Sequence, residues 1–280
     1  MIHPTPDLET IPQRGNGIWD YISPSRLNLW LKCPLAFKAR YIDHIPTPTT
    51  PSLFLGKRVH AALEYWYRHR MLELPIDPAS VLDHINENWD AAVDSDTMTF
   101  KDEAEATRLQ QQTRDLVHAY LENISDEEPL PLAVESRWEL PLIDPSTGED
   151  LGLPLLGIVD LILDGRYGAT IIDFKTAANA SSPVEISHEL QLTSYSYLWR
   201  TATRQEEIQL QIRSLVKTKN PTLAIHCFGP QQERHFRRLF VVIREYLDAL
   251  DGGQFNFRPG WTCGSCDYRQ TVCAEWCGDV

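Results

Sequence analysis

The stretch LPLLGIVDLILDGRYGATIIDFKT (residues 153–176) decides the fold. Leu, Ile and Val are dense on both sides of the Asp-Gly turn signal at 164–165, which predicts two strands joined as a hairpin. Asp160 interrupts the first strand, and Asp173 and Lys175 interrupt the second. Because side chains at i and i+2 of a strand point the same way, Asp173 and Lys175 project together, and the hairpin brings them near Asp160.

Two acids inside such apolar strands are costly to bury without a partner. A divalent metal ion between Asp160 and Asp173, with Lys175 beside it, removes that cost and forms a hydrolytic centre. Such an ion polarises a phosphoryl oxygen and lowers the pKa of water, while the lysine stabilises charge on the phosphate. The alternative is structural, because acids in strands are often half-exposed and paired with a lysine, and D-x-K alone occurs by chance in many proteins.

The flanking sequence predicts a mixed α/β chain. Before the hairpin, apolar periodicity predicts two short helices from Pro24 to Tyr41, helices near 55–72, 77–93 and 101–123, and a strand over 132–142. After it we expect a helix over 185–200, strands over 208–218 and 222–228, and a helix over 230–250. The expected organisation is a flexible arm (1–20) and one domain (21–280). That domain consists of a helical portion (21–130), a catalytic α/β core (131–250) and a cysteine-rich tail (251–280).

Composition and charge restrict the class of protein. The chain has 280 residues, of which 42% are hydrophobic, so it can bury a substantial core. It shows neither an apolar run long enough for a membrane span nor a secretory signal, so we expect a cytoplasmic protein. The net charge of −13 argues against a nucleic-acid partner, but it is uneven. An acidic middle (73–164) lies between basic stretches at 26–70 and 200–244, which leaves room for a DNA-binding face.

Five motifs occur in an order that resembles the RecB-like branch of the PD-(D/E)XK nuclease superfamily. They are SPSRLNLWLKCPLAFKARYI (23–42), GKRVHAALE (56–64), GIVDLI (157–162), IIDFKT (171–176) and QLTSY (191–195). Each motif is weak alone, but the ordered set is specific. The resemblance implies a restriction-endonuclease-like mixed sheet with a helical N-terminal half.

The resemblance also implies roles for individual residues. The metal ligands would be His60, Asp160, Asp173 and the carbonyl of Phe174, a set that suits Mg²⁺ or Mn²⁺. Lys175 would act in catalysis together with Asp160 and Asp173. Gln191 and Tyr195, one helical turn apart, would bind the substrate strand or reach the catalytic lysine. Glu135 would support the site without binding the ion, and Glu64 would be structural.

The cysteines suggest a second centre. Cys263, Cys266 and Cys273 form a C-x2-C-x6-C pattern, and Cys33 lies far upstream. By resemblance these four hold a 4Fe-4S iron–sulfur cluster, although a zinc site with four thiolates has the same ligands. The six-residue gap leaves Cys277 as an alternative to Cys273. We expect Cys227 to be a buried free thiol.

The expected function is that of a metal-dependent DNA nuclease. The resemblance implies a single-strand exonuclease, with 5′ to 3′ direction favoured, acting on single-stranded or end-frayed DNA in repair, recombination or CRISPR adaptation, alongside other proteins of such a complex. Two alternatives remain open: a non-catalytic DNA-binding or assembly subunit that keeps the fold and the cluster, and an endonuclease on the same core.

Overall fold

The computed structural model describes residues 17–178 and 186–276. The helical portion contains α1 (Pro24–Lys32), α2 (Pro34–Tyr41), α3 (Pro51–Met71), α4 (Pro78–Glu87), α5 (Trp89–Ser95) and α6 (Glu103–Asn123). The strands are β1 (Pro131–Ile143), β2 (Asp150–Gly165), β3 (Gly168–Ala177), β4 (Gln209–Val216) and β5 (Thr222–Phe228). The remaining elements are two long helices, α7 (Ile186–Thr203) and α8 (Glu233–Asp251), a 3-10 helix η1 (Trp261–Ser265) and a short helix α9 (Val272–Glu275).

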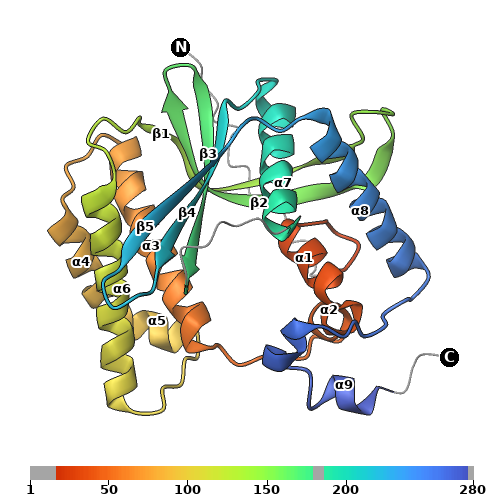
Figure 1. Ribbon diagram of the computed structural model, residues 1–280, viewed down its shortest axis with the longest axis horizontal. Helices are drawn as coiled ribbons and strands as arrows, with labels where there is room; N and C mark the ends of the chain where they lie inside the picture. Colours follow the sequence, from red (N-terminus) through yellow and green to blue (C-terminus); the bar gives the residue numbers. More distant parts are fainter. Residues whose placement is uncertain (1–16, 179–185, 277–280) are drawn as a thin grey trace.

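The five strands form one mixed sheet in the order β1-β2-β3-β4-β5 (Figure 1). Neighbouring strands are antiparallel except β3 and β4, which are parallel and connected through α7. This confirms the predicted α/β class and the predicted order of three strands, a helix, two strands and a helix. One expected element was wrong: the helix over 77–93 is two helices, α4 and α5, which meet at Asn88.

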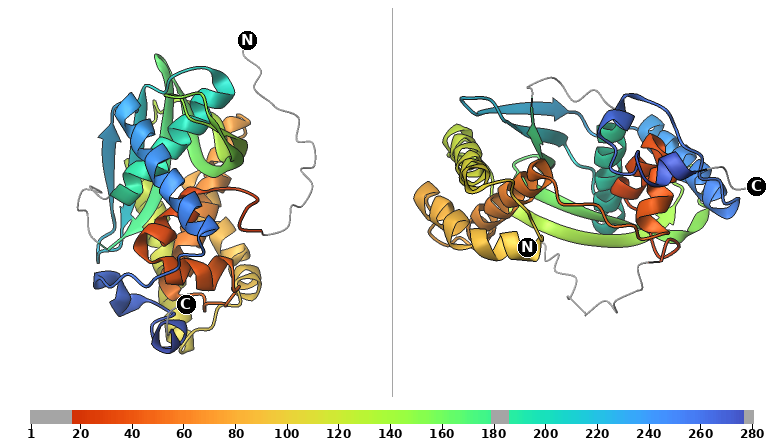
Figure 2. Two further views of the ribbon diagram at one scale, coloured as in Figure 1. Left: turned by 90° about the vertical axis from the view of Figure 1, so that its right-hand side faces the viewer. Right: turned by 90° about the horizontal axis from the view of Figure 1, so that it is seen from below.

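Helices cover the sheet in two groups. Helices α3 to α6 gather at one end of the molecule, and α1, α2, α7 and α8 gather at the other (Figures 1 and 2). Each group has its own hydrophobic core. On β3, Ile171 packs into the core under α7 and α8, while Ile172 and Phe174 pack into the core under α3 and α6. The alternation therefore directs Asp173 and Lys175 towards α7 and leaves Phe174 towards α3.

Gly157 lets α7 approach β2 closely. A Cβ at this position would lie 2.5 Å from Cδ1 of Leu198 and 3.5 Å from the ring of Tyr195. Any larger side chain would push the helix away from the strand. The glycine of the G-I-V-D motif thus fixes the distance between the strand with Asp160 and the helix with Tyr195.

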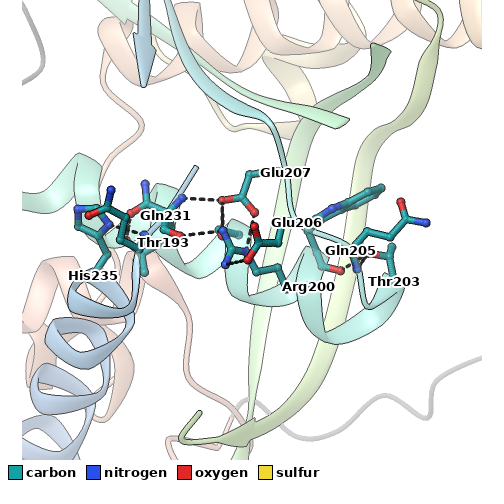
Figure 3. Close-up of polar contacts among 11 residues, drawn as sticks. Thr193, Arg200, Thr203, Gln205, Glu206, Glu207, Gln231 and His235 are labelled. Atoms are coloured by element: carbon teal, nitrogen blue, oxygen red, sulfur yellow. Dashed lines mark hydrogen bonds and ion pairs between the residues drawn. The ribbon is translucent and has the colours of Figure 1, made fainter. Parts of the chain in front are cut away.

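A buried polar cluster joins α7 to the start of β4 and of α8 (Figure 3). The Glu207 carboxylate accepts hydrogen bonds from Ser196 Oγ (2.7 Å), Arg200 Nε (2.8 Å) and the Gln231 N–H (2.8 Å). Burial alone would raise the pKa of Glu207, but these hydrogen bonds outweigh it and lower that pKa. The cluster therefore contains a fully buried carboxylate that stays ionised.

The described helices include none with both the length and the apolar character needed to cross a membrane.

Candidate active site

The peptide groups of Phe174 connect α3, β2 and β3. His60 Nε2 lies 3.1 Å from the Phe174 carbonyl oxygen, and the Phe174 N–H donates to Asp160 Oδ2 at 2.7 Å. The side chains of His60 on a helix and Asp160 on a strand therefore meet at one residue of β3, although His60 and Phe174 are more than a hundred residues apart in the sequence. The structure thus brings together three of the residues that the sequence assigned to a metal site.

Glu135 adds a carboxylate to the potential metal ligands His60 and Asp160. Its Oε1 lies 3.5 Å from His60 Nδ1, and Asp160 Oδ2 lies 3.8 Å from the same nitrogen. One ligand atom from each of His60, Glu135 and Asp160 lies within 4.8 Å of the others. The sequence placed Glu135 outside the ligand set, whereas the structure puts its carboxylate as close to His60 as that of Asp160. The only sign of this role in the sequence is that Glu135 is an acid in the strand next to the predicted hairpin with Asp160 and Asp173.

The backbone of Glu135 explains how its carboxylate reaches the site. Its neighbours Val134 and Ser136 pair with Leu161 and Val159, so Glu135 lies across the ladder from Asp160. Its φ is +43°, in the left-handed region that a side chain with a Cβ rarely occupies. Such conformations carry strain and concentrate at functional sites. The strand is locally turned, and two carboxylates on adjacent strands converge as a result.

Asp173 and Lys175 lie together on the other side of β3, as the i, i+2 spacing predicts. Lys175 Nζ is 2.7 Å from Asp173 Oδ2 and donates to Gln191 Oε1 at 3.2 Å. The amide nitrogen of Gln191 donates to Asp173 Oδ1 and to the Tyr195 hydroxyl, both at 2.8 Å. In this arrangement Gln191 contacts both the carboxylate and the lysine, and Tyr195 contacts Gln191. Both Asp173 oxygens are engaged there, outside the His60 group.

The site carries more negative than positive charge. Burial, followed by the nearby Asp173 carboxylate, raises the pKa of Asp160 well above its usual range. Burial lowers the pKa of Lys175, but the carboxylates of Asp173 and Asp160 more than compensate and raise it. The His60 pKa is likewise raised, because Glu135 and Asp160 outweigh the effect of burial. Three carboxylates and one lysine in a poorly solvated place, with an imidazole among them, fit a divalent cation.

Aromatic rings support Phe174 from behind. Its ring stacks on Tyr67 at 6.0 Å and meets Tyr120 edge-on at 5.6 Å. The two hydroxyls share a hydrogen bond of 2.6 Å, and Arg213 Nη1 donates to Tyr120 at 2.7 Å and to Glu128 at 2.6 Å. The phenylalanine, both tyrosines and Arg213 are buried, and the side chain of Glu128 is largely covered. Sequence reasoning missed this cluster, because its members are scattered over some 150 positions and share no motif.

Four cysteines converge at the chain ends. Cys33 separates α1 from α2, Cys263 lies in η1, Cys266 directly follows it, and Cys273 lies in α9. Burial raises the pKa of the Cys273 thiol, and the neighbouring sulfurs of Cys33, Cys266 and Cys263 raise it further. Among the described cysteines none forms a disulfide. The four expected cysteines thus lie in one region of the structure, while Cys277 lies outside the described residues.

The tail is held against α2 by a small core and a hydrogen bond. Ala36, Ala39 and Tyr268 form that core, with Cys33 and Cys266 packed against it. The Tyr268 hydroxyl donates to the Ile45 carbonyl at 3.1 Å. Cys227 is elsewhere, on β5, and it is exposed, so the expectation of a buried thiol was wrong. β5 is an edge strand, and its alternate residues face solvent.

Comparison with protein families agrees with this geometry. The family model described as the PD-(D/E)XK nuclease superfamily matches residues 21–274. The chain belongs to this superfamily. The match includes every residue discussed in the two centres except Cys277.

A solved structure shows a similar fold. The chain is similar to a protein from Eubacterium rectale that is described provisionally as an exonuclease, with 12% identity and a TM-score of 0.58. That alignment covers 89% of this chain and 88% of the other. The protein SSO0001 aligns over 92% of this chain and 87% of its own, with 15% identity and a TM-score of 0.41. A search of curated protein sequences gave no match.

Proposed function

We propose that this nuclease is a metal-dependent single-strand DNA exonuclease of the RecB-like type. The observation that carries the proposal is the meeting of the His60, Glu135 and Asp160 donors with the Asp173–Lys175 pair around one residue of β3. Superfamily membership supports a phosphodiester hydrolase acting on DNA. The resemblance of the five motifs supports the finer assignment, including 5′ to 3′ direction and a role in repair, recombination or CRISPR adaptation.

Each residue has a distinct role in this proposal. His60, Asp160, Asp173 and the Phe174 carbonyl would hold Mg²⁺ or Mn²⁺, and Glu135, whose carboxylate lies beside His60, would join them. When bound, the ion polarises the phosphoryl group and lowers the pKa of water. Lys175 places its charge where negative charge develops on the phosphate.

Gln191 limits the freedom of that lysine, and Tyr195 in turn accepts a hydrogen bond from Gln191. Gln191 accepts from Nζ and donates to Asp173, so the ammonium group is fixed between two oxygen partners. A third of the Lys175 side chain stays exposed, which leaves it accessible to a substrate. The chain thus orients the lysine before any strand binds, and orientation fixed in advance lowers the barrier of the chemical step.

We further propose that Cys33, Cys263, Cys266 and Cys273 bind a 4Fe-4S cluster. Their convergence from opposite ends of the chain supports a shared ligand, and the RecB-like layout supports iron and sulfur rather than zinc. Anaerobic purification followed by iron and zinc analysis tests this directly. Brown protein with about four irons per chain supports the cluster, and colourless protein with one zinc would overturn it while leaving the nuclease intact.

An end-labelled single strand tests the activity. We expect shortening that requires Mg²⁺ or Mn²⁺, is lost in Lys175→Ala and Asp160→Ala, and is slowed by a blocked 5′ end. Glu64→Gln is the matched control, since Glu64 lies one turn from His60 on α3 but pairs with Arg68 at 2.7 Å.

Three outcomes would contradict the proposal. Cleavage by Lys175→Ala at the parent rate in single turnover would show that the site is misassigned. Rapid cutting of a closed circle would show an endonuclease. Tight DNA binding without cleavage in either metal would favour a non-catalytic subunit.

A further inference from the structure

Helix α3 runs along the end of β3 beyond the active site. Three residues of α3, spaced four apart, lie against the strands here. His60 contacts Phe174, Gly56 lies beside Thr176, and Ser52 contacts Lys217. Residues at i, i+4 and i+8 share one face of a helix. The middle contact is close, because a Cβ on Gly56 would lie 3.4 Å from Thr176 Oγ1. The face that begins at the proposed metal ligand therefore ends at a lysine.

Lys217 is positioned by the strands that carry the catalytic residues. It follows Val216, the last residue of β4, which pairs with Ala177 of β3. Its own N–H donates to the Ala177 carbonyl at 2.8 Å, so the backbone at Lys217 is fixed against the catalytic strand. Its Nζ donates to Ser52 Oγ at 2.9 Å. Lys217 therefore lies at the carboxyl end of the strand that pairs with the strand of Asp173 and Lys175.

The charge on Lys217 is not paired within the part of the chain that the structure describes. Within residues 17–178 and 186–276, no carboxylate lies within 4.0 Å of its ammonium group. Burial lowers the pKa of Lys217, as expected for a half-buried ammonium group with no carboxylate nearby among the described residues. Lys57 and Arg58 on α3 differ from Lys217 in this respect, because both form ion pairs with Asp96. An ammonium group has three donors, and a single hydroxyl leaves two of them available for an anion.

We propose that Lys217, assisted by Ser52, binds a backbone phosphate of the DNA strand whose scissile phosphate lies at the His60–Asp160 group. The proposal rests on the proposed function, and it identifies where the strand continues. Ser52 is eight residues from His60, about 12 Å along the helix at roughly 1.5 Å per residue. At about 3.4 Å per nucleotide, this separation corresponds to roughly three to four nucleotides of a stacked strand.

The surface beyond Lys217 does not offer a second phosphate site. A hollow of about 460 Å³ lies between the start of α3, α6 and the β4–β5 loop. Its lining includes Arg108 and Lys219 but also Glu105 and Asp115. This mixed charge does not select a phosphate. The contact we infer is therefore a single one, at Lys217.

Equilibrium binding of a fluorescent single-stranded oligonucleotide, without divalent metal and over a series of KCl concentrations, tests the contact. One lost phosphate contact changes the slope of log K against log salt by about 0.7 for a single strand, which is about fivefold in affinity at 0.1 M salt. We expect Lys217→Ala to show both changes and Lys217→Arg to keep most of the affinity. Arg237→Ala is the charge-matched control, since Arg237 lies on α8 and pairs with Glu233.

Substrate length gives a second readout. For a long strand with metal present, Lys217→Ala should raise KM with little change in kcat, because the contact is remote from the reacting atoms. For a dinucleotide, which cannot span the distance, parent and variant should have the same kcat/KM. A merely structural role for Lys217 would affect both substrates alike, and thermal unfolding of each variant checks the fold.

The outcomes separate this inference from the proposed function. Unchanged affinity and salt slope in Lys217→Ala would overturn the phosphate contact and leave the nuclease standing. Binding that depends on Lys217 in a protein that never cleaves DNA would overturn the proposed activity and leave the contact standing. A parent protein that does not bind single strands at all would overturn both.

Discussion

Replacing Glu128 with alanine should destabilise the protein strongly. The carboxylate lies between two guanidinium groups, with Oε1 at 2.6 Å from Arg213 Nη1 and Oε2 at 2.5 Å from Arg70 Nη1, and it also accepts from the Tyr67 hydroxyl at 2.9 Å. The side chains of Glu128 and Arg213 are only 5% and 7% exposed. Removing the acid leaves the Arg213 cation buried beside two tyrosines, without a counterion among the described residues. Losing one partner of such a pair costs about 3–5 kcal/mol.

Urea denaturation of the parent and of Glu128→Ala measures this cost. A loss of that size should lower Tm by on the order of 10 °C in a domain of this length. Glu122→Ala is the control, because Glu122 lies on the exposed side of α6 and its one ion pair among the described residues is with His118, so its loss should stay within about 0.5 kcal/mol.

A double variant tests the reasoning itself. If the cost comes from the stranded charge, adding Arg213→Leu to Glu128→Ala should recover part of the stability, because the cation is then removed as well. The hydrogen bond between Tyr67 and Tyr120 remains in both variants. A loss below about 1 kcal/mol in Glu128→Ala, or a double variant less stable than either single one, would refute the electrostatic account.

Three further changes have distinct expected outcomes. Because the folded-state pKa of Glu207 is lowered, its contribution to stability is present above about pH 4.5 and lost as the pH falls through the folded value, so Glu207→Gln should weaken the acid dependence of unfolding by urea between pH 5 and 3. Gly157→Ala should cost about 1–3 kcal/mol by thermal melting, because the new Cβ meets Leu198 at 2.5 Å. Cys33→Ser should remove bound iron or zinc and lower Tm, whereas Cys227→Ser should leave metal content unchanged.

The sequence predicted those parts of the fold and site that follow from local periodicity. Alternation in β3 places Asp173 beside Lys175, and the helical spacing of Gln191 and Tyr195 puts both on the face that meets them. These relations depend on φ and ψ of regular elements and therefore survive any change in tertiary packing. The pairing of β2 with β3 follows from the predicted hairpin, since a short turn leaves few ways to connect two strands.

Irregular backbone and long-range contacts could not be predicted from the sequence. The left-handed φ of Glu135 is not encoded by its neighbours, and a regular strand would direct this carboxylate differently. Asn88 ends one helix and begins another without a proline or glycine to signal the break. Burial of Arg213 depends on α6 and the segment after it packing over β4, which no local pattern specifies.

Phe174 couples the stability of the core to the geometry of the site. Its carbonyl and N–H contact His60 and Asp160, while its ring is held by Tyr67 and Tyr120. A shift of this ring moves the backbone groups that hold two proposed ligands, because packed interiors transmit small displacements. Metal affinity should therefore fall together with folding stability when the cluster behind the ring is weakened. Titration of Mn²⁺ into Glu128→Ala, at a temperature where the variant remains folded, should show weaker binding than the parent. Unchanged Mn²⁺ affinity would show that the cluster stabilises the core without affecting the proposed metal site.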